Sequence, residues 1–143
     1  MRVYALRHGQ SEYNILGLCN DDSSVPVCLT PKGRQQANRV ANELRDISFD
    51  AAFCSPLPRA AETASIVLRP HSIKAVADER LADIRSGFEG RPGADYFAAP
   101  RRDRLRLRVN GGESLLDYRE RATGFVSWLG KQAFSSVLVV AHE

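Results

Sequence analysis

The chain has few cysteines, few aromatic residues and no long apolar run, and each shortage excludes a class of protein. The three cysteines among 143 residues are an odd number without metal-type spacing, which excludes a disulfide framework and indicates reduced thiols. No apolar stretch approaches the roughly 20 residues that span a bilayer. The N-terminus lacks a charged segment followed by a long apolar one, so no signal peptide is predicted. We therefore predict a cytoplasmic protein without membrane contact.

Aromatic residues make up only 8% of the chain, which bears on nucleic-acid binding. Five arginines crowd into residues 101–108, but the interleaved aromatic side chains on which bases stack are missing there. The run is therefore interpreted as a solvated face, or as a rim that attracts an anionic substrate. The net charge of +3 permits an anionic ligand without requiring one. We expect no nucleic-acid partner.

The remaining composition is that of a globular domain. At 43% hydrophobic and 26% charged, the chain is long enough to form a core of its own. It contains neither an internal repeat nor a low-complexity linker. We therefore predict that residues 1–143 form a single domain.

Short apolar runs alternate with amphipathic segments along the chain. Strands are predicted at Val3–Leu6, Phe49–Cys54, Lys74–Ala77 and Val137–Val140. Helices are predicted to begin at Pro31 after an N-cap at Thr30, to span about Pro58–Leu68, and to begin at Leu115 after an N-cap at Ser114. The stretch Arg80–Arg108 is rich in glycine and proline, so we predict loops there with at most one short helix. This alternation predicts an α/β fold, a three-layer αβα arrangement around a mainly parallel sheet.

Charged and nucleophilic side chains follow three of the predicted strands. Arg7 and His8 follow the first strand, Arg59 lies shortly after the second, and His142 follows the last. The carboxyl ends of parallel strands lie at one edge of a sheet, so we expect these side chains to converge. Such a cationic cluster is costly without an anion. Guanidinium groups match phosphate oxygens, and imidazole acts as a nucleophile or a proton carrier, so the cluster predicts phosphoryl chemistry.

These residues belong to motifs that together resemble a known family. The motifs are "LRHGQSEYN", "LTPKGRQQA", "CSPLPRAAETA", "GFEG", "NGGES" and "VVAHE". In this order, and over essentially the whole chain, they resemble the histidine phosphatase superfamily, also called the phosphoglycerate mutase-like family. A single RHG would be a weak signal, but several motifs in register are specific. The resemblance implies the phosphoglycerate mutase-like fold.

The resemblance also implies a role for each residue at the strand ends. His8 would be the nucleophile that becomes phosphorylated, and Arg7, Arg59 and His142 would hold the phosphoryl oxygens. Asn14 would line the pocket. Plainer interpretations stand beside these roles: Arg59 bracing its helix, Asn14 as a turn residue, and His142 as an inert residue at the end of the chain.

The family's proton donor is a glutamate, or in some branches an aspartate, on the loop after the third strand. "RLADIRSGFEG" places Asp83 at that position, and Glu89 is the nearest alternative. The segment between them is one residue shorter than the common pattern, and either acid also fits an ordinary solvated loop. The resemblance implies no metal and no cofactor, and the sequence has no carboxylate cluster of the kind that holds Mg²⁺.

Three functions fit this pattern. The first is a phosphatase that hydrolyses a small phosphomonoester through a phosphohistidine on His8. The second is a phosphoglycerate-type mutase, and the third is a non-catalytic module that binds phosphorylated ligands. Mutases of the family carry a longer insertion between the "GFEG" and "NGGES" motifs than the 20 residues Arg91–Asn110, which favours the phosphatase.

The last expectation concerns the end of the chain. His142 is the penultimate residue, whereas chains of the resembled family continue into another helix and usually another strand. We therefore expect a shortened form of the domain that lacks its C-terminal elements just after this second catalytic-site histidine. Such a form would be weakly active or inactive in isolation. Uncovered apolar sheet surface favours self-association, so we also expect a homodimer.

Overall fold

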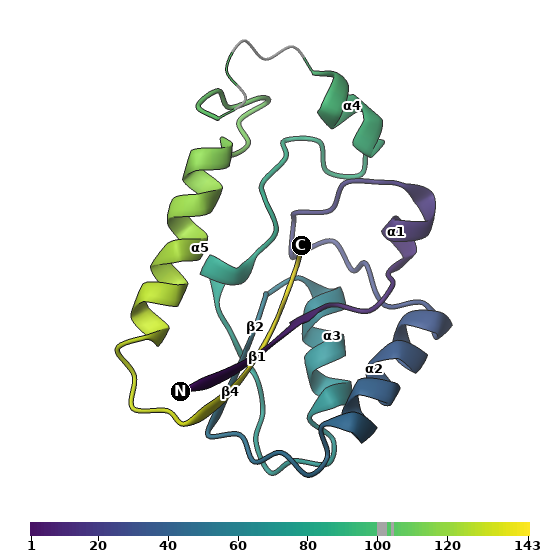
Figure 1. Ribbon diagram of the computed structural model, residues 1–143. Coiled ribbons are helices and arrows are strands. Elements are labelled where there is room, and N and C mark those ends of the chain that lie inside the picture. Colours follow the sequence, from purple (N-terminus) through teal and green to yellow (C-terminus); the bar gives the residue numbers. More distant parts are fainter. Residues whose placement is uncertain (100–102, 104) are drawn as a thin grey trace.

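The computed structural model describes residues 1–99, 103 and 105–143, and it places a sheet between two helical layers (Figure 1). The elements in chain order are β1 (Arg2–Arg7), α1 (Glu12–Leu16), α2 (Pro31–Glu43), β2 (Ala51–Cys54), α3 (Pro58–Val67), β3 (Val76–Ala77), the 3₁₀ turn η1 (Glu79–Leu81), α4 (Gly93–Ala98), α5 (Leu115–Leu129) and β4 (Ser136–Ala141). Figure 1 shows α2 and α3 on one side of the sheet and α5 on the other. The predicted α/β class is confirmed.

The sheet places the last strand beside the first. The strand order is β1-β4-β2-β3, and every pair is parallel. The register between β1 and β4 runs from Arg2 opposite Ser136 to Arg7 opposite Ala141. The residues that follow β1, β2 and β4 therefore emerge at the same edge of the sheet, as predicted for a ligand site.

The central strand β4 is buried on both faces. Leu138 and Val140 belong to the core beneath α2 and α3, while Val137 and Val139 belong to the core beneath α5. None of the four exposes more than 7% of its surface. A strand covered on both faces has no position for a polar residue, which explains the uninterrupted "VLVV" run.

The two predicted side-chain caps are present. Thr30 Oγ1 accepts the backbone N–H of Gly33 at 3.0 Å, and Pro31 is the first residue of α2. Ser114 and Asp117 form a reciprocal capping box at the start of α5. Both helices therefore begin where local hydrogen bonding predicts.

Two strands are shorter than predicted. β2 begins at Ala51 instead of Phe49, because the Asp50 carboxylate accepts the backbone N–H groups of Ser135 and Ser136 and ends the ladder there. The third strand pairs only over Val76–Ala77 of the four residues predicted.

The helix α1 was not predicted. It has only five residues, which is too short for a repeating apolar pattern, and none of them is buried. Its ends are set instead by a capping box between Ser11 and Asn14 and by Gly17, which adopts the left-handed conformation at φ 66°.

Between 80 and 108, α4 is the short helix that the sequence allowed. Positions 100–102 and 104 lie outside the described residues, so the interpretation of the arginine run concerns only part of that run. Within it, Arg106 pairs with Asp103, and Arg108 pairs with Asp117. No helix in the described part of the chain has the length and hydropathy of a membrane span.

A close backbone approach explains the glycine that follows Arg7 and His8. A Cβ atom added to Gly9 would lie 2.5 Å from the carbonyl oxygen of Gly33 in α2, and one added to Gly33 would lie 2.1 Å from that of Gln10. Only two glycines allow the first turn of α2 to pack this tightly against the loop after β1. Helix α2 thereby holds the loop that carries His8.

We predict that Gly33→Ala destabilises the protein, whereas Gly124→Ala stabilises it. The first substitution overpacks a backbone contact, which costs about 1–3 kcal/mol. The second changes a glycine of α5 whose added Cβ meets no atom within 4 Å, and alanine in an exposed helix gains roughly 0.5–1 kcal/mol. Urea unfolding of both variants measures the difference. Equal effects at the two positions would contradict the close-approach argument.

Candidate active site

A pocket of about 180 Å³ lies at the carboxyl edge of the sheet. It is lined by the six residues to which the family resemblance assigns a role: Arg7, His8, Asn14, Arg59, Asp83 and His142. The other lining residues are Ser11, Tyr13, Leu18, Cys19, Asn20 and Glu143. Residues that are far apart in the sequence therefore meet in one cavity.

The ring of His8 is buried and held in one tautomer. Its Nδ1 lies 2.7 Å from the carbonyl oxygen of Gly9, which can only accept, so Nδ1 carries the proton. Its Nε2 accepts the Nε–H of Arg59 at 3.0 Å. Burial, and to a smaller extent the charge of Arg59, lower the pKa of His8 to about 4. The ring is thus neutral at neutral pH, and its unprotonated Nε2 is held by the Arg59 N–H.

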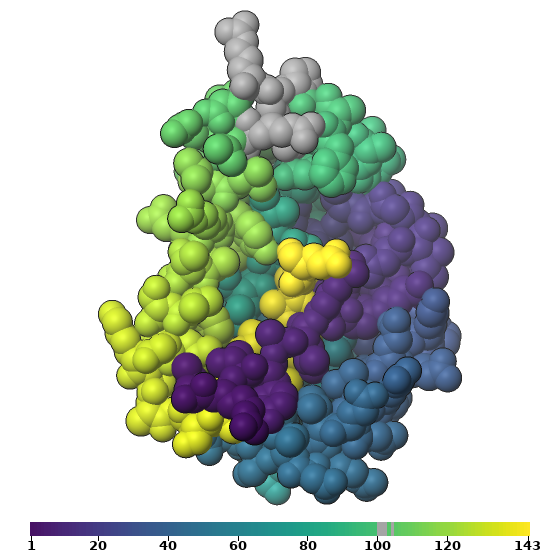
Figure 2. All heavy atoms as spheres, viewed as in Figure 1, coloured from purple at the N-terminus to yellow at the C-terminus, as the bar shows by residue number. Residues whose placement is uncertain are grey.

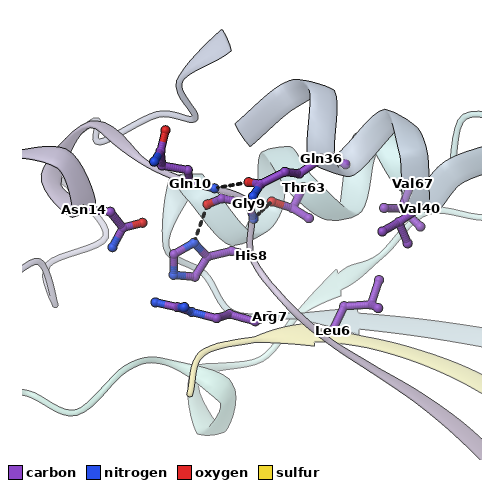
Figure 3. Close-up of a pocket in the computed structure, with 11 residues that line it drawn as sticks. Leu6, Arg7, His8, Gly9, Gln10, Asn14, Gln36, Val40, Thr63 and Val67 are labelled. Atoms are coloured by element: carbon purple, nitrogen blue, oxygen red, sulfur yellow. Dashed lines mark hydrogen bonds between the residues drawn. The ribbon is translucent and has the colours of Figure 1, made fainter. Parts of the chain in front are cut away.

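The loop around His8 is tied to both helices on its side of the sheet (Figure 3). The Gly9 N–H donates to Thr63 Oγ1 of α3 at 3.0 Å, and the Gln10 N–H donates to Gln36 Oε1 of α2 at 2.9 Å. These contacts fix the backbone on which the His8 ring stands. Figure 3 also shows Arg7 extending alongside His8, with Asn14 facing the same region.

Arg59 is buried at the pocket and donates hydrogen bonds to four of its residues. Only 4% of its surface is exposed. Besides His8, its guanidinium donates to the side-chain and backbone oxygens of Asn20, to Asp83 Oδ2 at 3.1 Å and to His142 Nδ1 at 3.3 Å. Arg59 is the second residue of α3, but its side chain reaches into the pocket instead of bracing the helix.

His142 is held by a residue at the end of β2. Its Nε2 lies 2.8 Å from Ser55 Oγ, and its Nδ1 accepts from Arg59, so Nε2 carries the proton. The His142 and His8 rings lie 5.1 Å apart. Burial, followed by the charge of Arg59, lowers the pKa of His142 to about 2. The ring is therefore neutral, buried and fixed, unlike an inert residue at a loose chain end.

The two candidate acids occupy different positions. Asp83 lines the pocket with Oδ2 3.1 Å from Arg59 and 3.5 Å from His142 Nδ1, and burial raises the pKa of its carboxyl group. Glu89 does not line the pocket. Its carboxylate accepts the Asn20 amide and the backbone N–H groups that follow Asn20. Glu89 thus supports the Asn20 segment that contacts Arg59, whereas Asp83 faces the cavity.

Asn14 combines the two interpretations given to it. Its Oδ1 accepts the N–H of Ser11 at 2.9 Å and the hydroxyl of Ser11 at 3.0 Å, which caps α1, and the residue also lines the pocket. Arg7, at the rim, lies 3.3 Å from the carboxylate of Glu143.

Sequence reasoning did not assign a role to Ser55 or Asn20, which orient His142 and Arg59. Ser55 is fully buried directly after a strand, and a small polar residue at that position is a signal that sequence reasoning could have used. Asn20 lies in a polar loop and carries no comparable signal. The described residues contain no group of three or more His, Cys, Asp and Glu side chains placed to hold a metal ion.

The family model of the histidine phosphatase superfamily (branch 1) matches residues 3–143. The chain belongs to this superfamily. Its histidine phosphatase relatives include the adenosylcobalamin/alpha-ribazole phosphatase of Escherichia coli (strain K12), which is 30% identical over 152 residues, covering 100% of this chain and 74% of that protein. A probable phosphoglycerate mutase of Escherichia fergusonii is 29% identical over 151 residues, covering 99% of this chain and 69% of that protein.

Solved histidine phosphatase structures share the fold. The alpha-ribazole phosphatase from Shigella flexneri superposes with a TM-score of 0.89 at 29% identity, covering 100% of this chain and 74% of that one. The predicted phosphoglycerate mutase-like fold is therefore confirmed.

We predict that the pocket histidines make folding pH-dependent. The folded rings stay neutral far below the ordinary histidine pKa of 6.5, so only the unfolded chain gains protons as the pH falls through that value. Stability is therefore unaffected above pH 6.5 and falls below it, by about 1 kcal/mol per histidine between pH 6.5 and 5.5.

Urea unfolding across this pH range measures the effect. The raised pKa of Asp83 has the opposite effect, because it makes the folded state more stable as the pH falls. The contribution of His142 is therefore obtained by comparing the pH dependence of the wild type with that of His142→Asn. Identical pH dependence in the two proteins would contradict a neutral, buried His142.

Proposed function

We propose that this protein hydrolyses small phosphate monoesters through a phosphohistidine on His8. The observation that carries the proposal is the fixed tautomer of His8, whose Nε2 lone pair lies in a pocket beside the guanidinium of Arg59. A nucleophilic imidazole needs this lone pair, and a phosphoryl group needs nearby positive charge. Several relatives are named phosphatases, which supports the same reaction.

In the first step, the Arg59 N–H turns from His8 Nε2 to a phosphoryl oxygen. The freed Nε2 then attacks the phosphorus atom, and the bond from phosphorus to the leaving oxygen breaks. Arg7 and Arg59 bind the phosphoryl oxygens and balance their charge. His142 presents Nδ1 to the pocket without a proton, so it donates to a phosphoryl oxygen only after taking a proton from solvent as the anion binds, and it returns that proton to solvent when phosphate leaves. Burial raises the pKa of Asp83 and so favours its protonated form, which gives its proton to the leaving oxygen.

In the second step, water attacks the phosphohistidine. The Asp83 carboxylate left by the first step accepts a proton from the water as the new phosphorus–oxygen bond forms and the bond to His8 breaks. Inorganic phosphate leaves, and His8 and Asp83 return to their starting protonation states. One carboxyl group thus serves as acid and then as base.

A phosphoglycerate-type mutase would return the phosphoryl group to a substrate hydroxyl instead of water. Some relatives are named mutases, so the assay must also test for this alternative. Incubating the phosphoenzyme with a phosphoglycerate separates the two: release of inorganic phosphate supports hydrolysis, and a doubly phosphorylated product supports transfer. A binding module without catalysis would form no phosphoenzyme.

Two further expectations remain predictions. The free thiols of Cys19, Cys28 and Cys54 favour a cytoplasmic location. The edge strand β1 exposes 44% of Val3, which favours the homodimer. The same phosphatase assay measures the activity of this chain, and light scattering measures its oligomeric state.

We predict that His8→Ala abolishes phosphatase turnover and phosphoenzyme formation. The phosphoenzyme of the wild type is expected to be labile to acid and stable to base, as a phosphoramidate bond requires. His71→Gln is the matched control because His71 is the one of the three histidines that does not line the pocket. Labelling with a ³²P-phosphomonoester checks both variants, and wild-type turnover in His8→Ala would exclude His8 as the nucleophile.

We predict that Asp83→Asn lowers kcat/KM selectively for substrates with poor leaving groups. General acid catalysis contributes ~10²–10⁴-fold where the leaving oxygen needs a proton, so an alkyl phosphate is expected to lose that factor and p-nitrophenyl phosphate much less. The ratio kcat/KM is the quantity to measure because it reports phosphoenzyme formation and excludes the second step.

Glu89→Gln is the control for this prediction. Its carboxylate supports the Asn20 segment and faces no leaving group, so its loss affects both substrates alike. Selective loss in Glu89→Gln instead of Asp83→Asn would reassign the acid.

A further inference from the structure

A single arginine outside the pocket binds the backbone that carries Asp83. Arg121, on α5, exposes only 13% of its side chain. Its Nη1 donates to the carbonyl oxygens of Glu79, Arg80 and Ala82 at 3.1, 3.1 and 2.9 Å, and its Nη2 donates to the carbonyl oxygen of Asp83 at 3.0 Å. One guanidinium thus gathers the carbonyl groups of the turn that leads into Asp83.

Glu113 binds the same guanidinium. Its carboxylate forms a two-pronged pair with Arg121, at 2.8 Å to Nε and 2.7 Å to Nη2. The same carboxylate accepts the backbone N–H of Arg85 at 3.1 Å, and the Glu113 N–H donates to the Arg85 carbonyl oxygen. The pair therefore holds the chain on both sides of Asp83, at the turn before it and at Arg85 after it.

Arg121 has no hydrogen-bonding capacity left for a substrate. A guanidinium carries five N–H groups, and the contacts to Glu113 and to the four carbonyl oxygens occupy all of them. Arg121 also does not line the pocket. An effect of Arg121 on catalysis therefore acts at a distance, through the position of Asp83 or through its charge, and Arg121→Lys keeps that charge.

The carboxyl group of Asp83 needs such support. The turn before it, η1, has only three residues, and β3 has only two, so regular secondary structure adds little rigidity. Carbonyl groups that lose their donor would turn toward water and move the loop. A displacement of about 1 Å at a reacting group costs on the order of 10²-fold in rate.

We propose that Arg121, held by Glu113, is a positioning residue that fixes Asp83 over the leaving oxygen. The proposal rests on the proposed function, in which Asp83 is the acid. Arg121→Lys keeps the charge but loses the planar fork that reaches four carbonyl groups and a carboxylate together. Glu113→Gln keeps the shape of the partner but removes its charge.

The first test is the dependence of kcat/KM on the leaving group. Arg121→Lys and Glu113→Gln are expected to lower kcat/KM for an alkyl phosphate by about 10- to 100-fold, with much smaller losses for p-nitrophenyl phosphate. Arg119→Lys, an exposed arginine on the same helix, is the control and is expected to change neither. Equal losses on both substrates, or no loss, would overturn the proposal.

The second test does not depend on turnover. The ¹³C carboxyl signal of Asp83, assigned with Asp83→Asn, reports its pKa, which burial raises in the wild type. In Arg121→Lys the loosened loop exposes the carboxyl group, so its pKa is expected to fall toward the ordinary value of 3.8. An unchanged titration would show that Arg121 does not hold Asp83. A wild type that forms no phosphoenzyme would defeat the proposed function, while this titration would still decide the role of Arg121.

Discussion

The buried guanidinium of Arg59 is the constraint on which the site depends. It donates to His8, Asn20, Asp83 and His142, groups that come from four separate segments of the chain. Burying a charge of this kind is costly unless every N–H finds a partner, and here the surrounding segments supply the partners. Each of these segments is in turn held in place by its own contacts with the rest of the fold. An arriving phosphoryl group would meet a charge that is already positioned, and it would take over N–H groups that now bind the surrounding segments.

Residues outside the pocket position the groups that contact Arg59. Glycine contacts between the β1 loop and α2 place His8, and Ser55 at the end of β2 orients His142. Glu89 holds the Asn20 segment, and Arg121 holds the Asp83 segment. The supporting groups lie outside the set that would touch a phosphoryl group, yet they decide the distances within that set. In the space-filling view, the end of β4 reaches the surface beside the first strand (Figure 2), so substrate would approach where both strands end.

Two acids in the same loop illustrate how structure assigns roles. The sequence motif favours Asp83 but leaves Glu89 as an alternative only six positions away. In the fold, Glu89 satisfies backbone N–H groups at the Asn20 segment, which uses its charge structurally. Asp83 is left facing Arg59 and His142 in a pocket that raises its pKa. The two carboxyl groups thus differ in their neighbours, and the sequence alone does not show which residues those neighbours are.

The sequence by itself determined the helix caps at Thr30 and Ser114, the buried "VLVV" strand and the gathering of Arg7, His8 and His142 at strand ends. These features follow from local hydrogen bonding and from the geometry of parallel strands, which nearby residues encode. Only the tertiary structure decided the tautomers of the two histidines, the contact between Asn20 and Arg59, and the hold of Arg121 on Asp83. Apart from the contact of His8 with the adjacent Gly9, these features depend on distances between residues dozens of positions apart, which no local pattern specifies. Helix α1 was missed for a different reason: its five residues are too few to show a hydrophobic period, and none of them is buried.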